Sequence, residues 1–199
     1  MSGRFFFRGP ARLAQWQNPS VKRANGNVII VGMMGAGKTT VGRLLARRLR
    51  RRFIDSDREV ELRCGVRIST IFEIEGEEGF RAREAQVIEQ LTAEQGIVLA
   101  TSGGAVLREE SRRRLAAAGT VVYLHAKPED LYERVRHDKN RPLLATADPL
   151  ARLRELYAQR DPIYRGIADL VIDTGAQSVQ ALTHRLIQRL QALQTATSA

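Results

Sequence analysis

The sequence is short of cysteine, of aromatic side chains and of long apolar runs, and each shortage excludes a class of protein. Its 199 residues include one cysteine, Cys64, and 6% aromatic residues. A single cysteine cannot form an internal disulfide, and it cannot by itself hold a structural zinc ion. No apolar run approaches the roughly 18 residues that a membrane-spanning helix needs. We therefore expect a cytoplasmic location, no membrane partner and no disulfide framework.

The charge balance is strongly positive, but half of the excess lies in one short segment. The chain has 32 basic and 22 acidic residues, which gives a net charge of +10. Residues 1–27 contribute five basic residues and no acidic one. A basic protein attracts anions such as nucleic acid, anionic lipid or a phosphorylated small molecule. Because the rest of the chain is far less unbalanced, we expect a small anion rather than nucleic acid as the partner.

Three segments are distinguished by composition and periodicity. Residues 1–27 lack sustained periodicity, and we predict a basic, flexible extension there. Their apolar centre is too short for a cleaved secretory signal, and they are not serine-rich as organelle-targeting peptides are. Residues 28–194 are expected to form a single domain, since 43% of the chain is hydrophobic and can build one core. Residues 195–199 are expected to fray.

Short apolar runs alternate with amphipathic stretches between the two tails. The runs typical of buried strands are 28–31, 52–54, 97–101, 120–125 and 170–173. Helical spacing occurs over 39–51, 73–94 (as two stretches), 108–118, 128 to about 138, 149 to about 157 or beyond, and 178–193. Strands that alternate with helices in this way predict an α/β domain with a five-stranded parallel sheet and helices on both faces.

The strongest local signal is the segment GMMGAGKT at 32–39, an unbroken match to the phosphate-loop pattern GxxxxGK[ST]. Its glycines let backbone N–H groups turn toward an anion, and the following helix adds the positive end of its dipole. Lys38 is expected to reach the β- and γ-phosphates, and the Thr39 hydroxyl is a natural Mg²⁺ ligand. We predict a P-loop nucleotide site formed by Gly35, Ala36, Gly37, Lys38, Thr39 and Thr40.

A second Mg²⁺ ligand is expected at the carboxyl end of a strand. The run 97–101 leads into a serine and two glycines, so it supplies no carboxylate. Asp55 and Asp57 follow the run 52–54 directly and are the candidates. The same acidic cluster is equally compatible with the solvated first turn of a helix, where carboxylates are favoured.

Six segments together resemble the shikimate kinase family: GMMGAGKTT, FIDSDREVE, IFEIEGEEGFRAREAQVI, LATSGGAVL, RPLL and QRDPIY. They come in the order and approximate spacing of that family and cover nearly everything from Val28 to Thr174. The phosphate loop is common to many proteins, whereas the DSD, GFR, SGGAV and RDPIY elements are much more specific. The resemblance implies a three-layer P-loop NTPase fold of the nucleoside monophosphate kinase type. It also implies a kinase that uses ATP and Mg²⁺ to phosphorylate the 3-hydroxyl of shikimate, in aromatic amino-acid biosynthesis.

The resemblance assigns roles to residues around the acceptor. Asp57 would contact the substrate hydroxyls, orient the attacking one and take its proton, while Asp55 would steady a metal-bound water. Arg81 of GFR and Arg160 of RDPIY would hold the substrate carboxylate, because guanidinium groups match carboxylates as forked donors. Lys38, which would hold the donor phosphates, and Asp57 are therefore two of the expected catalytic residues.

Each arginine has a simpler interpretation when it is taken alone. Arg81 is suitably spaced for a helical ion pair with Glu77 or Glu84. Arg160 stands next to Asp161, which offers a comparable local partner. Only the joint occurrence of these elements favours the binding roles.

The glycine-rich segment after the third apolar run departs from the family pattern. Gly103 and Gly104 are implied to offer backbone N–H groups to the substrate. The family commonly has a third glycine where this chain has Ser102, and serine does not easily adopt a positive φ. The serine hydroxyl could instead bond a phosphate-bound water or the metal shell. We expect Ser102→Gly to leave turnover within a few-fold.

Residues 137–151 carry turn signals and are predicted to form a lid. The resemblance places Arg141 of RPLL in this lid, close to the transferring phosphate, as a catalytic and ATP-binding residue. It places Arg134 against the adenine of ATP. The alternative for this basic region is a solvated helix end that its own dipole stabilises.

Three competing functions remain at this stage. A gluconate kinase shares the phosphate loop and the size, and a nucleoside monophosphate kinase would need a base pocket that the sequence does not reveal. The basic run at 47–52 is the best argument for a nucleic-acid-binding module, but it lacks interleaved aromatic residues. We expect a monomeric enzyme with ATP and a small-molecule acceptor as its partners.

Overall fold

A computed structural model describes residues 26–138, 142–175 and 177–198. Its centre is one sheet of five parallel strands in the order β2-β3-β1-β4-β5. The strands are β1 (Asn27–Val31), β2 (Arg52–Asp55), β3 (Ile97–Ala100), β4 (Gly119–His125) and β5 (Leu170–Asp173). All five apolar runs therefore form strands, and the predicted fold class is confirmed.

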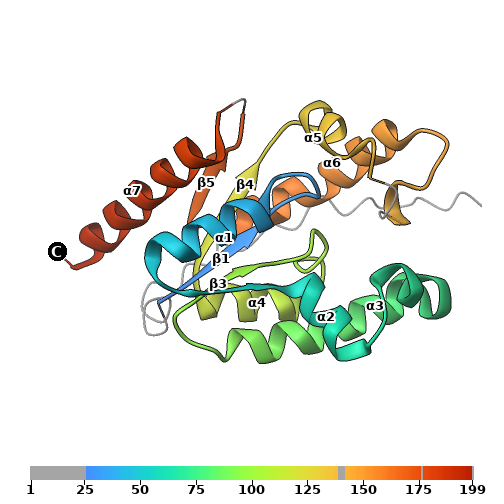
Figure 1. The fold of residues 1–199 in the computed structure, drawn as a ribbon, viewed down its shortest axis with the longest axis horizontal. Coiled ribbons are helices and arrows are strands. Elements are labelled where there is room, and N and C mark those ends of the chain that lie inside the picture. Colours follow the sequence, from blue (N-terminus) through green and yellow to red (C-terminus); the bar gives the residue numbers. More distant parts are fainter. Residues whose placement is uncertain (1–25, 139–141, 176, 199) are drawn as a thin grey trace, which may run out of the picture.

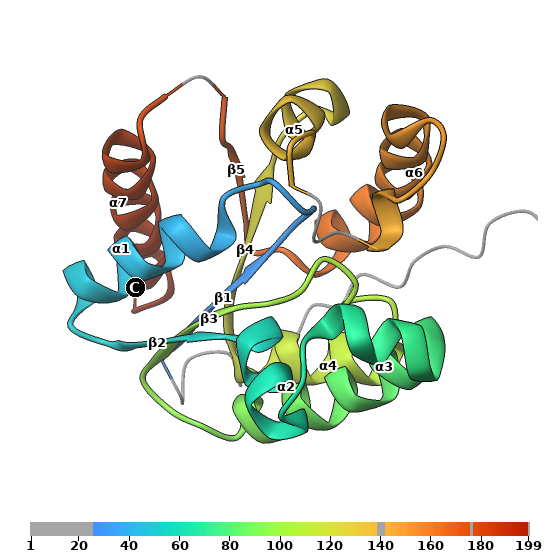
Figure 2. The same cartoon turned by 45° about the vertical axis from the view of Figure 1, so that its right-hand side comes forward.

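Helices cover both faces of the sheet. They are α1 (Lys38–Leu49), α2 (Ser56–Cys64), α3 (Ile68–Thr92), α4 (Glu109–Ala118), α5 (Pro128–Val135), α6 (Pro149–Ile167) and α7 (Val179–Ser198), with a short 3₁₀ helix η1 (Pro142–Leu144) before α6. α1 packs against α7 on one face, while α3 packs against α4 on the other (Figures 1 and 2). The result is the expected three-layer arrangement.

The core follows from this layering. β1 and β3 lie inside the sheet with helices on both sides, so every residue of the two strands is buried. Such strands read as continuous apolar runs rather than alternating ones. On the helices, residues such as Leu45, Ile88 and Leu186 complete the core with side chains that are fully buried.

Three elements differ from the sequence expectation. The acidic segment after β2 forms a complete helix, α2, which Asp55 caps by accepting a hydrogen bond from the Asp57 N–H at 3.1 Å. α3 begins at Ile68, earlier than expected, and bends at Gly76, where φ is 70°. α7 reaches Ser198, so residues 195–198, which we expected to fray, lie in its last turn.

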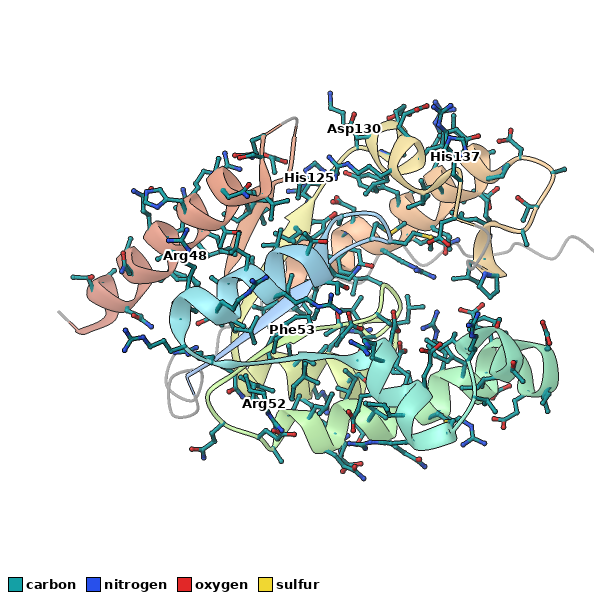
Figure 3. All side chains as sticks on the ribbon, viewed as in Figure 1. Arg48, Arg52, Phe53, His125, Asp130 and His137 are labelled. Carbon is teal, nitrogen blue, oxygen red and sulfur yellow. The ribbon has the colours of Figure 1, made fainter. Side chains whose placement is uncertain are left out.

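The basic run at the end of α1 is a solvated surface. Arg47, Arg48 and Arg50 are exposed, and Arg52 pairs with Glu94 (Figure 3). Beside this region the ring of Phe53 packs closely against Gly42 of α1, where a Cβ would lie only 2.5 Å from the ring. Within the described ranges, none of the helices is both long and apolar enough to cross a bilayer.

Candidate active site

The phosphate loop connects β1 to α1 in a conformation that requires glycine. Gly32, Gly35 and Gly37 have φ values of 144°, 78° and 87°. A Cβ on Gly32 would lie 2.6 Å from the Leu124 carbonyl oxygen, and one on Gly35 would lie 2.7 Å from Val135 Cγ1. The loop therefore packs tightly on the end of β4 and on α5, which holds its backbone in place.

The loop ends at the amino terminus of α1, where two cationic features meet. Gly37 caps the helix without a side-chain hydrogen bond, so the first-turn N–H groups are left for a ligand. Lys38 Nζ donates to the Met33 carbonyl oxygen at 2.9 Å, which folds the lysine back over the loop. A positive helix end beside a lysine suits the phosphates of a nucleotide.

A hydroxyl and a carboxylate meet beside this helix end. Thr39 Oγ1 donates to Asp55 Oδ2 at 2.6 Å. Both are hard oxygen donors, and Mg²⁺ is usually held by one or two protein oxygens together with substrate phosphates and water. Among the described residues no cluster of three or more His, Cys, Asp or Glu side chains could hold a metal alone. The donor set therefore fits Mg²⁺ that is shared with a nucleotide rather than a metal site built by the protein alone.

A pocket of about 430 Å³ opens beside the phosphate loop. It lies near the carboxyl ends of the strands, with α2 and α3 on one side and η1 and α6 on the other (Figure 1). Its polar lining includes all five residues that the resemblance assigned to the substrate: Asp57, Arg81, Gly103, Gly104 and Arg160. Its apolar lining comes from Met34, Ile68, Phe72, Phe80, Pro142 and Leu143.

Arg81 is buried against the wall of this pocket. Its guanidinium pairs with Glu77 and with Glu84, at 3.0 Å in each case. A Cβ on Gly104 would lie 2.2 Å from the guanidinium carbon, so the arginine lies directly against the glycine backbone. Burial alone would lower the pKa of Arg81, but Glu84 and Glu77 raise it overall. The ion pairs foreseen as an alternative do form, yet they fix a buried pocket arginine and not a surface one.

Arg160 is equally buried but has no carboxylate partner among the described residues. Its Nη1 donates to the Gly103 carbonyl oxygen at 3.4 Å, and its buried Nε has no hydrogen-bond partner within the described ranges. Burial lowers the pKa of Arg160, and the positive charge of Arg81 adds to the effect. The predicted alternative, a pair with Asp161, is wrong, because Asp161 accepts from Arg165 at 2.8 Å instead.

Asp57 has the most perturbed carboxyl group of the site. Its Oδ1 is buried and has no hydrogen-bond partner among the described residues. Burial, followed by the negative charge of Asp55, raises the pKa of Asp57 from 3.8 to about 7, while Lys38 opposes the rise. A carboxyl group with such a pKa can exchange a proton near neutral pH, and perturbed groups of this kind gather at functional sites.

Arg134 ties the phosphate loop to the end of the sheet. Its guanidinium donates to the Gly35 carbonyl oxygen at 3.3 Å, to Thr174 Oγ1 at 3.0 Å and to the Gly175 carbonyl oxygen at 3.0 Å. Arg134, which is predicted to contact adenine, thus connects the phosphate loop to the backbone segment that follows β5. Arg141, predicted to act from the lid, lies outside the described residues.

Ser102 and Glu84 form a contact that the sequence did not reveal. Ser102 has no positive φ, since Arg50 is the only described residue other than glycine with one, so the doubt about the loop geometry does not apply. The serine hydroxyl is buried and donates to Glu84, not to the Thr39–Asp55 pair. The sequence predicts Glu84 only as a surface ion-pair partner of Arg81. The helical spacing between Glu84 and Arg81 was the one sequence feature that pointed to Glu84 at all.

Comparisons with known proteins point to one family. The family model described as shikimate kinase matches residues 34–191. A shikimate kinase from Chromobacterium violaceum is 58% identical over 172 residues, which cover 86% of this chain and 94% of that relative. One from Ralstonia nicotianae is 60% identical over 165 residues, which cover 83% of this chain and 87% of the relative.

The fold is also similar to that of a solved structure. A shikimate kinase from Acinetobacter baumannii in complex with shikimate has a TM-score of 0.83 and 43% identity. The match covers 88% of this chain and 98% of that one.

Proposed function

This chain belongs to the shikimate kinase family and phosphorylates shikimate with ATP, and from that premise we propose how its pocket performs the transfer. The acceptor lies in the pocket of about 430 Å³, and the phosphate loop holds the donor. The observation that carries the proposal is the convergence of Asp57, Arg81 and Arg160 on one pocket beside the loop. The family match favours shikimate over the gluconate alternative.

The two arginines hold the carboxylate of the acceptor. Arg81 is already paired with two glutamates, whereas Arg160 has a buried charge without a carboxylate partner among the described residues. An uncompensated buried cation favours an anionic ligand strongly, because the ligand removes the cost of its burial. A small polyhydroxy acid whose carboxylate faces Arg160 satisfies this requirement.

Asp57 orients the acceptor 3-hydroxyl. Its unpartnered Oδ1 can accept a hydrogen bond from a hydroxyl group of the substrate. Its raised pKa of about 7 also lets it take the proton as the phosphate bond forms. Phosphoryl transfer passes through a loose transition state, so positioning by Asp57 contributes more than its strength as a base.

The donor is held by the loop backbone, by Lys38 and by the amino terminus of α1. Thr39 and Asp55 would hold Mg²⁺, which when bound neutralises charge on the β- and γ-phosphates. Arg134 keeps the loop against the segment after β5, where it fixes the edge of the nucleotide site. The role of Arg141 at the transferring phosphate stays a prediction.

Steady-state release of ADP tests the assignment. We expect ADP release with shikimate that requires Mg²⁺, and at most a few per cent of that kcat/KM with quinate or gluconate. Lys38→Met should abolish it, whereas Lys127→Met, at an exposed lysine before α5, should not. Equal rates with gluconate, or full activity of Lys38→Met, would contradict the proposal.

A further inference from the structure

The hydroxyl of Ser102 lies between two groups of the acceptor pocket. It donates its hydrogen to Glu84 Oε1 and accepts the Gly104 N–H at 3.2 Å. All of these atoms are buried. A serine hydroxyl has one hydrogen and two lone pairs, so its single donor is fully used by the carboxylate.

Both partners of the Ser102 hydroxyl touch Arg81. Glu84 accepts from Arg81 Nη1 through both oxygens, at 3.2 and 3.0 Å. Gly104 lies so close to the guanidinium that even a Cβ would overlap it. The serine therefore connects the carboxylate that grips the arginine to the backbone on which the arginine lies.

This contact matters because, among the described residues, the hydrogen bonds to the Glu84 carboxylate come from Arg81 and from Ser102 alone, so Ser102 is the partner that does not move with Arg81. A buried carboxylate must be hydrogen-bonded, and an unsatisfied one reorients or draws in water. Arg81 can follow Glu84 if the glutamate changes rotamer, since the guanidinium is held there by that carboxylate and by the more exposed Glu77. Loss of the hydroxyl would thus move the arginine.

We propose that Ser102 is a positioning residue, which fixes Glu84 and through it orients Arg81 toward the carboxylate of the acceptor. The proposal rests on the function proposed above, in which Arg81 binds that carboxylate. Ser102 itself need not touch the substrate. Its effect is therefore expected in the recognition of one substrate group and not in phosphoryl transfer.

The test compares two acceptors, shikimate and its methyl ester, which lacks the negative charge. For Ser102→Ala we expect KM for shikimate to rise about tenfold, because a charged hydrogen-bond network is broken one step from the ligand. KM for ATP and kcat should stay within about twofold. Selectivity for shikimate over the ester should fall by the same tenfold, while Ser102→Thr, which keeps a hydroxyl, should restore most of it.

Ser56→Ala is the matched control. Ser56 Oγ accepts the Ser102 N–H at 2.9 Å, so this change removes a buried hydrogen bond to the same residue without touching Glu84. It should lower the melting temperature and leave the selectivity unchanged. If Ser102→Ala weakens both acceptors equally, or if Ser56→Ala loses selectivity as well, the serine is merely structural and the proposal is overturned.

Arg81→Lys separates this inference from the proposed function. If Arg81→Lys removes the preference for the charged acceptor and Ser102→Ala does not, only the role of Ser102 is refuted. If Arg81→Lys leaves that preference intact, the carboxylate-binding role of Arg81 is refuted first.

Discussion

The two buried arginines of the pocket differ in charge balance, and this difference decides what each can do. Arg81 faces two carboxylates, so its charge is compensated within the protein. Arg160 has none among the described residues, and burial lowers its pKa. The guanidinium of Arg81 is thus held in place before the substrate binds, while Arg160 provides the uncompensated positive charge that attracts an anion.

Replacing Arg160 by methionine should separate binding from stability. We expect KM for shikimate to rise at least 100-fold, because a charge-assisted contact is lost. The free protein should become more stable, on the order of 1 kcal/mol, since a buried unpaired charge is removed. Kinetics and thermal unfolding measure the two effects.

Arg165→Met is the control for that change. Arg165 lies on the same helix, is half exposed, and pairs with Asp161. It should alter neither KM nor stability by much, as surface ion pairs contribute little. A destabilised Arg160→Met protein with an unchanged KM would contradict the binding role.

The raised pKa of Asp57 makes stability depend on pH. The Asp57 carboxyl has a pKa of about 7 in the folded chain and near 3.8 in the unfolded chain. Between these two pH values, the carboxyl is therefore protonated in the folded state and ionised in the unfolded state. The stability that protonation contributes is present below about pH 4 and is lost as pH rises through 7. Relative to the parent, Asp57→Asn should therefore gain on the order of 4 kcal/mol between pH 4 and pH 8.

Denaturant unfolding at several pH values checks this expectation. Asp130→Asn serves as the control, because Asp130 is an exposed carboxyl on α5 (Figure 3). The free energy of unfolding of Asp130→Asn should change with pH in the same way as that of the parent. Parallel curves for Asp57→Asn as well would mean that the carboxyl titrates normally.

At the scale of elements, α5 is the support of the phosphate loop. Leu131 and Val135 of this helix lie against Gly35, where a Cβ would meet the Leu131 carbonyl oxygen at 3.2 Å and Val135 Cγ1 at 2.7 Å. A side chain there must push the loop and the helix apart. Since Arg134 of the same helix also bonds Gly35, the displacement would reach the segment after β5.

Gly35→Ala should therefore damage nucleotide binding specifically. We expect KM for ATP to rise more than tenfold, together with a stability loss of about 1 kcal/mol from the strained φ. Gly96→Ala is matched in backbone strain, with φ of 68°, but has open space around its Cβ position. Gly96→Ala should lose about 1 kcal/mol from its φ alone, no more than Gly35→Ala, and keep its KM for ATP. An equal rise in KM for ATP in both variants would refute the role of α5.

The elements were predictable from local pattern, but several contacts of the site were not. Five apolar runs indicated five strands. The central strands β1 and β3 are buried on both faces and therefore apolar throughout, whereas the edge strands β2 and β5 are only partly buried. The pair of Ser102 with Glu84 depends on how α3 packs against the loop after β3, which no local pattern encodes. The alternative pair of Arg160 with Asp161 does not form, because adjacent residues on a helix point in different directions.

At the scale of the whole molecule, we predict a monomer. The described residues expose four large apolar side chains: Leu62, Val66, Ile74 and Val171. A stable interface buries about 800 Å² from each partner and involves roughly 20 residues a side. Four side chains are too few for the apolar centre of an obligate dimer.

Light scattering during gel filtration should therefore give a mass near 22.3 kDa at micromolar concentration. The same mass is expected with ATP and shikimate present, because the described pocket is lined within a single chain. Twice this mass, persisting on dilution, would contradict the prediction.

The position of β1 at the centre of the sheet has a consequence for how the protein is made. β1 is synthesised first, yet its hydrogen-bonding neighbours β3 and β4 come some 70 and 90 residues later. A nascent chain thus carries an apolar strand without its sheet partners until β3 and β4 have been synthesised. We therefore expect the nucleotide site to form only after both strands have emerged and paired with β1.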